Sequence, residues 1–204
     1  MAITVHQNDL PKEISFESAV AVDSETLGLN PLRDRLCVVQ LSGGDGDAHL
    51  VQFDGTNYEA PNLKALLANR DLIKIYHFAR FDLAAIYHWL GIWAAPVFCT
   101  KIASKLTRTY TDKHGLKDLT RELLEIDLSK QQQSSDWGAK QLSQAQQAYA
   151  ASDVLYLHQL QEKLTQRLIR EQRLEIAQKA FEFLPTRAEL DLIGWPESDI
   201  FAHS

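Results

Sequence analysis

Residues 18–41 have the sequence SAVAVDSETLGLNPLRDRLCVVQL, and this segment indicates most of the architecture. It contains two short runs of β-branched and apolar residues, 18–25 and 35–41, separated by Asn30-Pro31. Such runs, bounded by turn residues, predict strands. A third run, AHLVQF at 48–53, follows the turn-rich SGGDGD of residues 42–47. We expect these three strands to form an antiparallel meander.

Beyond residue 60 the hydrophobic period changes from that of strands to a mixture of helices and strands. The predicted elements are helices at 61–70, 80–90 and 114–124, a buried strand at 72–78, a strand that turns helical over 97–106, a polar connection at 128–142, and mostly helix over 143–183. Ser143 and Gln146 have the spacing of a capping box at the start of that helical region. Strands that alternate with helices after a meander predict an α/β fold with a mixed central sheet.

The chain of 204 residues, 45% of them hydrophobic and 24% charged, has the balance of a single globular domain. We expect that domain to cover residues 1–184. Residues 185–204 are expected to form a tail that packs on this domain or on a neighbouring subunit, because they include apolar side chains such as Trp195 and Phe201. Cys37 and Cys99 lie in apolar segments and are expected to be buried, reduced thiols.

The sequence predicts a cytoplasmic protein with no membrane partner. Its apolar runs stay below the roughly 18 residues that span a bilayer, and MAITVHQNDL lacks the pattern of a signal peptide. The net charge of −6 disfavours a long polyanion, but residues 101–117 hold five Lys or Arg and one acid. Charge alone leaves this basic segment open to two interpretations, a solvated surface or a local binding site for phosphate.

The acidic side chains in three segments carry the chemistry. Asp23 and Glu25 are two apart on a predicted strand and therefore share a face, where two carboxylates lie either in water or around a cation. Asp82 follows the strand at 72–78, at the start of a helix, where an acid is often only a cap. Tyr149 and Asp153 are four apart on a helix and share a face, which is also an ordinary packing arrangement.

Taken in order, D-x-E, an acid in H-x4-D form and Y-x3-D resemble the DEDDy branch of the DnaQ-like 3′–5′ exonucleases, which includes ribonuclease D. The stretches VDSETLGL, RDRLCVVQLS, FCTKIASKLTRTYTDKHGLK, SKQQQSSDW, YAASDVLYLH and DIFAHS are similar to stand-alone NrnC-type nano-RNases. This resemblance implies an RNase H-like (DnaQ-like exonuclease) fold, with residues 1–184 as the exonuclease domain.

The resemblance also implies a metal-dependent reaction. Asp23, Glu25, Asp82 and Asp153 would bind two divalent ions, and oxygen-only ligands favour Mg²⁺ or Mn²⁺. Tyr149 would orient the attacking water. The implied substrates are short 5′-phosphorylated RNAs, preferentially dinucleotides, hydrolysed from the 3′ end to nucleoside 5′-monophosphates. A homo-oligomeric ring, an octamer in the family, is implied as well.

Substrate contacts are expected at Leu29, between the two bases, and at His77 and Phe78, in the pocket. The basic segment is expected to cap the 5′ phosphate through Arg108, Tyr110, Lys113 and His114. Three alternatives remain at this point: ribonuclease D-like trimming of longer RNA, exonuclease action on DNA ends, and a nucleic-acid-binding module without catalysis.

Overall fold

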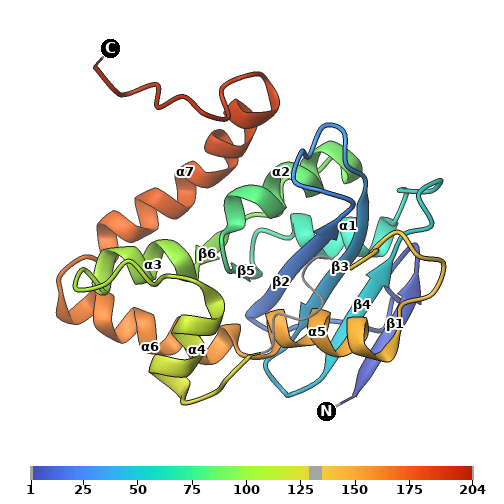
Figure 1. Ribbon diagram of the computed structural model, residues 1–204, viewed down its shortest axis with the longest axis horizontal. Helices are drawn as coiled ribbons and strands as arrows, with labels where there is room; N and C mark the ends of the chain where they lie inside the picture. Colours follow the sequence, from blue (N-terminus) through green and yellow to red (C-terminus); the bar gives the residue numbers. More distant parts are fainter. Residues whose placement is uncertain (1, 129–134, 204) are drawn as a thin grey trace.

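The computed structural model describes residues 2–128 and 135–203 of the chain. In this part of the chain six strands form one mixed sheet, in the order β1-β4-β3-β2-β5-β6, with helices on both faces (Figure 1). The strands are β1 (Ile3–Gln7), β2 (Ala19–Thr26), β3 (Leu36–Ser42), β4 (Ala48–Gln52), β5 (Ile73–Tyr76) and β6 (Val97–Cys99). The helices are α1 (Pro61–Ala68), α2 (Ala79–Leu90), α3 (Thr100–Thr107), α4 (Leu116–Leu124), α5 (Gln144–Leu155), α6 (Leu157–Arg170) and α7 (Leu174–Leu192).

The meander expected from the sequence is confirmed: β2 pairs antiparallel with β3, and β3 with β4. β5 and β6 then extend the sheet in parallel with β2. β1, which the sequence analysis does not predict, pairs in parallel with β4 at the sheet edge. Its five residues, ITVHQ, carry too few apolar side chains to give a clear strand pattern. The α/β fold with a mixed sheet and flanking helices is therefore confirmed.

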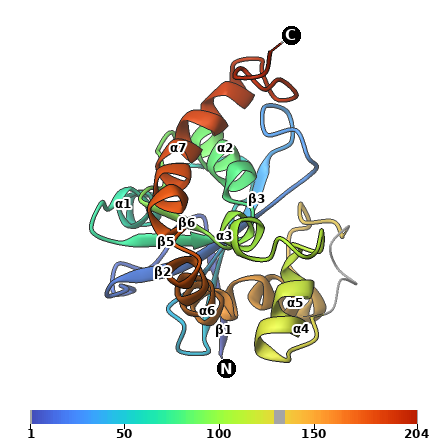
Figure 2. The ribbon, with the colours of Figure 1, turned by 90° about the vertical axis from the view of Figure 1, so that its left-hand side faces the viewer.

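Helix α5 lies across one face of the meander. It contacts β2, β3 and β4, and its Ala150 packs with Trp137 and with Val38 of β3 in a small apolar cluster. On the other face α2 lies against β2 and also contacts α7 (Figure 2). β2 thus runs through the centre of the protein with a helix above and below it, which brings side chains from both helices to its carboxyl end.

The C-terminal helical region differs from the expectation at Pro185. We expected the tail to start there, but α7 continues through Pro185 to Leu192. Leu184 and Ala188, on either side of the proline, are buried, so packing holds the helix together although Pro185 cannot donate its backbone hydrogen bond. The boundary expected between residues 184 and 185 therefore falls inside a helix. Of the polar connection expected at 128–142, residues 129–134 lie outside the described residues.

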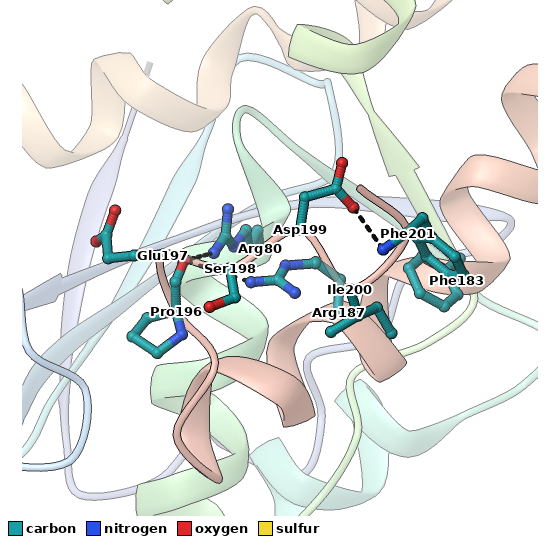
Figure 3. A pocket seen from close by; sticks show the side chains of 9 residues that line it. All are labelled: Arg80, Phe183, Arg187, Pro196, Glu197, Ser198, Asp199, Ile200 and Phe201. Atoms are coloured by element: carbon teal, nitrogen blue, oxygen red, sulfur yellow. Dashed lines mark hydrogen bonds between the residues drawn. The ribbon is translucent and has the colours of Figure 1, made fainter. Parts of the chain in front are cut away.

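Two arginines hold the chain that follows α7. Arg80, in the first turn of α2, donates to both carboxylate oxygens of Asp191 at 2.6 and 2.7 Å. Arg187 donates to Asp191 as well, and to the carbonyl oxygen of Trp195 at 2.6 Å. Figure 3 shows both guanidinium groups beside residues 196–201, where they enclose a cavity of about 410 Å³. The tail thus contacts its own domain, while the Phe201 side chain remains 76% exposed.

No helix in the described part of the chain combines the length and the apolar character needed to cross a lipid bilayer.

Candidate active site

The first two acids project from the carboxyl end of β2. Asp23 pairs in register with Gln40 of β3 and Glu25 with Val38, so both carboxylates leave the face of the sheet that α5 covers. Gln40 is fully buried, and its Nε2 lies 3.4 Å from Asp23 Oδ2, to which it donates. Directly after Glu25 the register shifts in a bulge, which ends the regular pairing at this point.

Helix α5 supplies the third acid and the tyrosine. The capping box expected from the sequence is present: the Ser143 hydroxyl accepts from the Gln146 backbone, and the Gln146 side chain accepts from the Ser143 backbone. This cap starts the helix at a defined residue, which fixes the rotation of its face. Tyr149 and Asp153 lie one turn apart on the face that meets β2.

Folding brings three of the four acids together. Asp23, Glu25 and Asp153 each present a carboxylate oxygen such that these oxygens all lie within 4.8 Å of one another. Asp153 is 128 residues beyond Glu25 in the chain, so this proximity is a product of the tertiary fold. The spacing is that of ligands around a single cation, and all three ligand atoms are oxygens.

The fourth acid reaches β2 from the opposite side. Asp82 lies in the first turn of α2 and is only 3% exposed. Ser24, whose side chain points away from those of Asp23 and Glu25, donates its hydroxyl proton to Asp82 Oδ1 at 2.6 Å. Asp82 is not one of the three acids within 4.8 Å, but its charge contributes to the pKa shifts of Asp23 and Glu25.

Crowding of these acids changes their protonation. Burial raises the pKa of Asp23 well above its ordinary value, and the charges of Asp82, Asp153 and Glu25 raise it further. Burial and then the charges of Asp153 and Asp82 raise the pKa of Glu25 to about 9. Burial also raises the pKa values of Asp82 and Asp153 to about 7 each. Without a cation the cluster therefore retains protons at neutral pH, and a divalent ion would displace them.

A cavity of about 320 Å³ opens onto the three clustered acids. His77 and Phe78 line it, as expected from the sequence, and Tyr149 lines it from α5. Leu29, which is 88% exposed on the loop after β2, lines a neighbouring groove instead. Phe78 borders both spaces. Its backbone is left-handed, with φ of 73°, an unusual conformation for a non-glycine residue.

Arg108, which was predicted to cap the 5′ phosphate, has a side chain that is only 1% exposed. Its guanidinium forms a salt bridge with Glu122 and donates to Ser104 Oγ at 3.0 Å and to the carbonyl oxygen of Lys113 at 2.6 Å. With the Nε bond to Glu122, four of its five N–H groups are bonded within the fold. Arginine in a basic run looks the same in sequence whether it is exposed or buried.

The other three residues of the expected phosphate cap do not line the cavity either, since none of Tyr110, Lys113 and His114 is among the described residues around it. The Tyr110 hydroxyl donates to Glu122 at 2.5 Å, and the His114 Nδ1 is 2.9 Å from Ser104 Oγ. Contact of these residues with substrate remains a prediction.

Two lysines of the same basic segment line the cavity, and the sequence analysis did not single them out. Lys101 is the second residue of α3, and Lys117 is the second residue of α4. The Lys101 Nζ lies 4.2 Å from the centre of the Phe78 ring, a cation–π contact. The sequence does contain a feature that could have identified Lys101. It lies two residues after β6, and the carboxyl ends of the parallel strands β2, β5 and β6 meet at one edge of the sheet.

These residues fit a divalent metal site. The ligand atoms are carboxylate oxygens, which suit hard cations such as Mg²⁺ and Mn²⁺, and no cysteine or histidine belongs to the described group. Burial and the mutual repulsion of the acids raise the pKa values of Asp23 and Glu25, and a bound cation would offset that repulsion. Asp23, Glu25 and Asp153 would hold the ion between them.

Comparison with known proteins agrees with this geometry. Residues 4–169 match a family model described as 3′-5′ exonuclease. The chain is 35% identical to a ribonuclease D of Acidiphilium cryptum over 168 residues, which are 82% of this chain and 42% of that protein. It thus spans less than half the length of that curated relative.

Two solved structures of Brucella melitensis NrnC match over the full length of both chains. The NrnC structure bound to pGG has a TM-score of 0.95 at 60% identity. The NrnC structure with bound Mg²⁺ has a TM-score of 0.94 at 59% identity. The family model, the shared fold and this identity together show that the chain belongs to the DnaQ-like 3′–5′ exonuclease family, in which its described structure is similar to that of the nuclease NrnC.

Proposed function

We propose that this protein is a 3′–5′ exoribonuclease that hydrolyses short 5′-phosphorylated RNAs, preferentially dinucleotides, to nucleoside 5′-monophosphates. The observation that carries this proposal is the group of three acids within 4.8 Å, on which the cavity opens. The cavity, at about 320 Å³, has room for one or two nucleotides at the 3′ end of a substrate. The relative bound to pGG, a short oligonucleotide, supports the same substrate class.

We infer that two divalent ions, Mg²⁺ or Mn²⁺, act in this site. When bound, such a pair activates a water and stabilises the leaving 3′ oxygen. Asp23 would contact both ions. It belongs to the group with Glu25 and Asp153, and the charge of Asp82 helps to raise its pKa. Ser24 donates to one oxygen of Asp82, so the other carboxylate oxygen would be available to a second ion.

Tyr149 acts on the water by position rather than as a base. Burial and the charges of Asp153, Glu25 and Asp23 raise the pKa of its hydroxyl above the ordinary value near 10. The hydroxyl therefore keeps its proton at neutral pH and orients the water by hydrogen bonding. Lys101 and Lys117 provide positive charge for the phosphates in a protein whose net charge is −6.

The deciding experiment measures cleavage of 5′-phosphorylated RNAs of two to about twenty nucleotides, and of the matching DNAs, with Mg²⁺, Mn²⁺ or a chelator. The proposal expects release of 5′-monophosphates from the 3′ end, fastest for dinucleotides and absent with the chelator. Equal or faster turnover of the long RNAs would favour ribonuclease D-like trimming, and faster turnover of DNA would favour a DNA exonuclease. No hydrolysis with any metal would leave a binding module.

We further propose that the protein assembles into a homo-oligomeric ring, as the family resemblance implies. Trp195 and Phe201 of the tail are 45% and 76% exposed in the single chain, and such apolar groups favour contact with a second copy. Light scattering of the purified protein tests this, and a monomer at micromolar concentration would refute it. We also propose a cytoplasmic location, because the RNA fragments that the enzyme would hydrolyse arise there.

A further inference from the structure

His77 lies between strand β5 and helix α2, and α2 carries Asp82. It follows β5 directly, and it lies two residues beyond Ile75, the partner of Ala21 in the parallel pairing of β5 with β2. Asp23 lies two residues beyond Ala21, so the two side chains are at the same end of the sheet. His77 accordingly lines the cavity of the clustered acids.

The hydrogen bonds of His77 determine which ring nitrogen carries the proton. The Thr100 hydroxyl lies 3.1 Å from the carbonyl oxygen of Tyr76, and a carbonyl can only accept, so the hydroxyl donates there. Its oxygen must then accept from the ring, and His77 Nδ1 is 2.9 Å away. The proton therefore sits on Nδ1, and Nε2 carries a lone pair.

The imidazole stays neutral in this setting. Burial, with a smaller contribution from the charge of Lys101, lowers the pKa of His77 to about 3. Nε2 is consequently an acceptor throughout the neutral range. Nε2 has no hydrogen-bond partner among the described residues. It is also absent from the group of fully buried polar atoms without a partner, so it is accessible. Nε2 is therefore open to the cavity.

An acceptor in the cavity of the three clustered acids would pair with a donor of the substrate. Phosphate oxygens only accept hydrogen bonds, so a bare Nε2 cannot bind them. The donors of a nucleotide are ribose hydroxyls and base N–H groups. The ribose is bonded directly to the phosphate that the acids and their ions would hold, whereas the base extends further, toward apolar surface such as the 44% exposed Phe78 ring.

We propose that His77 distinguishes RNA from DNA: its Nε2 accepts a hydrogen bond from a 2′-hydroxyl of the substrate, held in that tautomer by Thr100. This proposal rests on the exoribonuclease function proposed above. The 2′-hydroxyl is the group that DNA lacks, and an acceptor that a bound substrate covers without offering a donor is costly. His77 is thus a specificity-determining residue that touches the sugar, separate from the acids that act on the phosphate.

The kinetic test compares kcat/KM for pGG with that for its 2′-deoxy counterpart. His77→Leu removes the acceptor and is expected to lower the RNA-to-DNA ratio by about tenfold, the size of one such hydrogen bond. Thr100→Val frees the tautomer and lowers the ratio less. His77→Gln, which offers an amide oxygen as acceptor, restores part of the ratio. The matched control, His88→Leu at the exposed end of α2, leaves it unchanged. Equal losses on both substrates, or an unchanged ratio in a folded His77→Leu protein, would overturn the proposal.

A spectroscopic test separates this proposal from the proposed function. In the ¹⁵N-histidine NMR spectrum, the His77 ring signals are identified as those that disappear in His77→Leu. In the wild-type protein they should show a protonated Nδ1 and an unprotonated Nε2 between pH 5 and 8. Guanosine 5′-monophosphate with Ca²⁺ should shift the Nε2 signal, and the 2′-deoxy nucleotide should shift it less. A proton on Nε2, or equal shifts, would refute the assignment even in an active enzyme. A protein that cleaves nothing but shows these shifts would refute the exoribonuclease function alone.

Discussion

The hydroxyl of Ser24 donates a hydrogen bond to Asp82 Oδ1 over 2.6 Å, and this contact joins the two faces of the active site. Ser24 lies between Asp23 and Glu25 on β2, but its side chain points to the α2 side of the sheet. The same three-residue segment thus presents two carboxylates to the α5 side and a hydroxyl, bonded to Asp82, to the α2 side. The serine of D-S-E has a role of its own beyond spacing the acids.

We expect Ser24→Ala to lower kcat/KM by about 10- to 100-fold, the value of a hydrogen bond to a charged group. Asp82 is 3% exposed and would lose a donor that favours its ionised form. The Mg²⁺ concentration for half-maximal rate should rise with it. Ser42→Ala, which removes a buried strand hydroxyl bonded to the carbonyl of Asp47, is the matched control. A normal metal dependence in Ser24→Ala would contradict this role.

Asp153→Asn is expected to lower the rate by several orders of magnitude while the fold is kept, because one ligand of the three-acid group is lost. It should also raise the melting temperature of the metal-free protein. The reason is that the Asp153 charge raises the pKa values of Asp23 and Glu25, so its removal relieves repulsion. Activity and melting temperature are both measured with and without Mn²⁺. A near-normal rate in Mn²⁺, or a lower metal-free melting temperature, would count against the metal site.

The pH dependence of stability should reveal the same crowding. Glu25 has a pKa of about 9 in the fold, and Asp82 and Asp153 have pKa values of about 7. Unfolded carboxyls titrate near 4, so between about pH 4 and 9 the folded state binds more protons than the unfolded state. The contribution of these acids to stability is therefore fully present below about pH 4 and is lost as the pH rises to about 9.

Urea unfolding in a chelator should show that loss as a falling midpoint between pH 5 and 9. The fall should be shallower in Mg²⁺, which compensates the ionised acids, and in Asp153→Asn. A midpoint in the chelator that is independent of pH would mean that these acids are not crowded in solution.

Lys101 and Lys117 are expected to bind substrate phosphate. Lys101→Ala and Lys117→Ala should each raise KM by about tenfold, change kcat little, and weaken the salt dependence of KM. Lys105→Ala is the matched control, since Lys105 is exposed one turn further along α3 and does not line this cavity. An equal KM in all three variants would mean that the two lysines only balance the charge of the acids.

Local spacing was sufficient to predict which acidic side chains share a face, whereas their catalytic role was implied only by the family resemblance. Asp23 and Glu25 are two apart on a strand, and Tyr149 and Asp153 are four apart on a helix, so each pair shares a face wherever its element packs. The strands β2 to β4 were predictable for the same reason. Their convergence with Asp82 was not, because it depends on how α2 and α5 lie on β2, and only the family resemblance anticipated it.

What sequence could not decide was burial. His77 is a strand-end histidine in sequence, and only the bonds of Thr100 show which nitrogen faces the cavity. Pro185 suggested the end of a helix, but the packing of its neighbours Leu184 and Ala188 carries α7 past it. In the basic segment, Lys101 and Lys117 line the cavity of the acids, whereas Arg108 is buried, and the sequence does not distinguish these two environments.

Arg108 provides the sharpest test of that last distinction. Because the arginine is buried and bonded to Glu122, Ser104 and the backbone of Lys113, Arg108→Met should act on stability and not on substrate binding. We expect the free energy of unfolding to fall by about 2 kcal/mol, less than the roughly 3–5 kcal/mol for a fully buried ion pair, because the Glu122 side chain is 38% exposed. In a chain of this size that is a fall of about 4–8 °C in melting temperature. KM for pGG, measured well below that temperature, should stay at the wild-type value. A raised KM with an unchanged melting temperature would contradict this structural role and would support contact of Arg108 with the 5′ phosphate of the substrate.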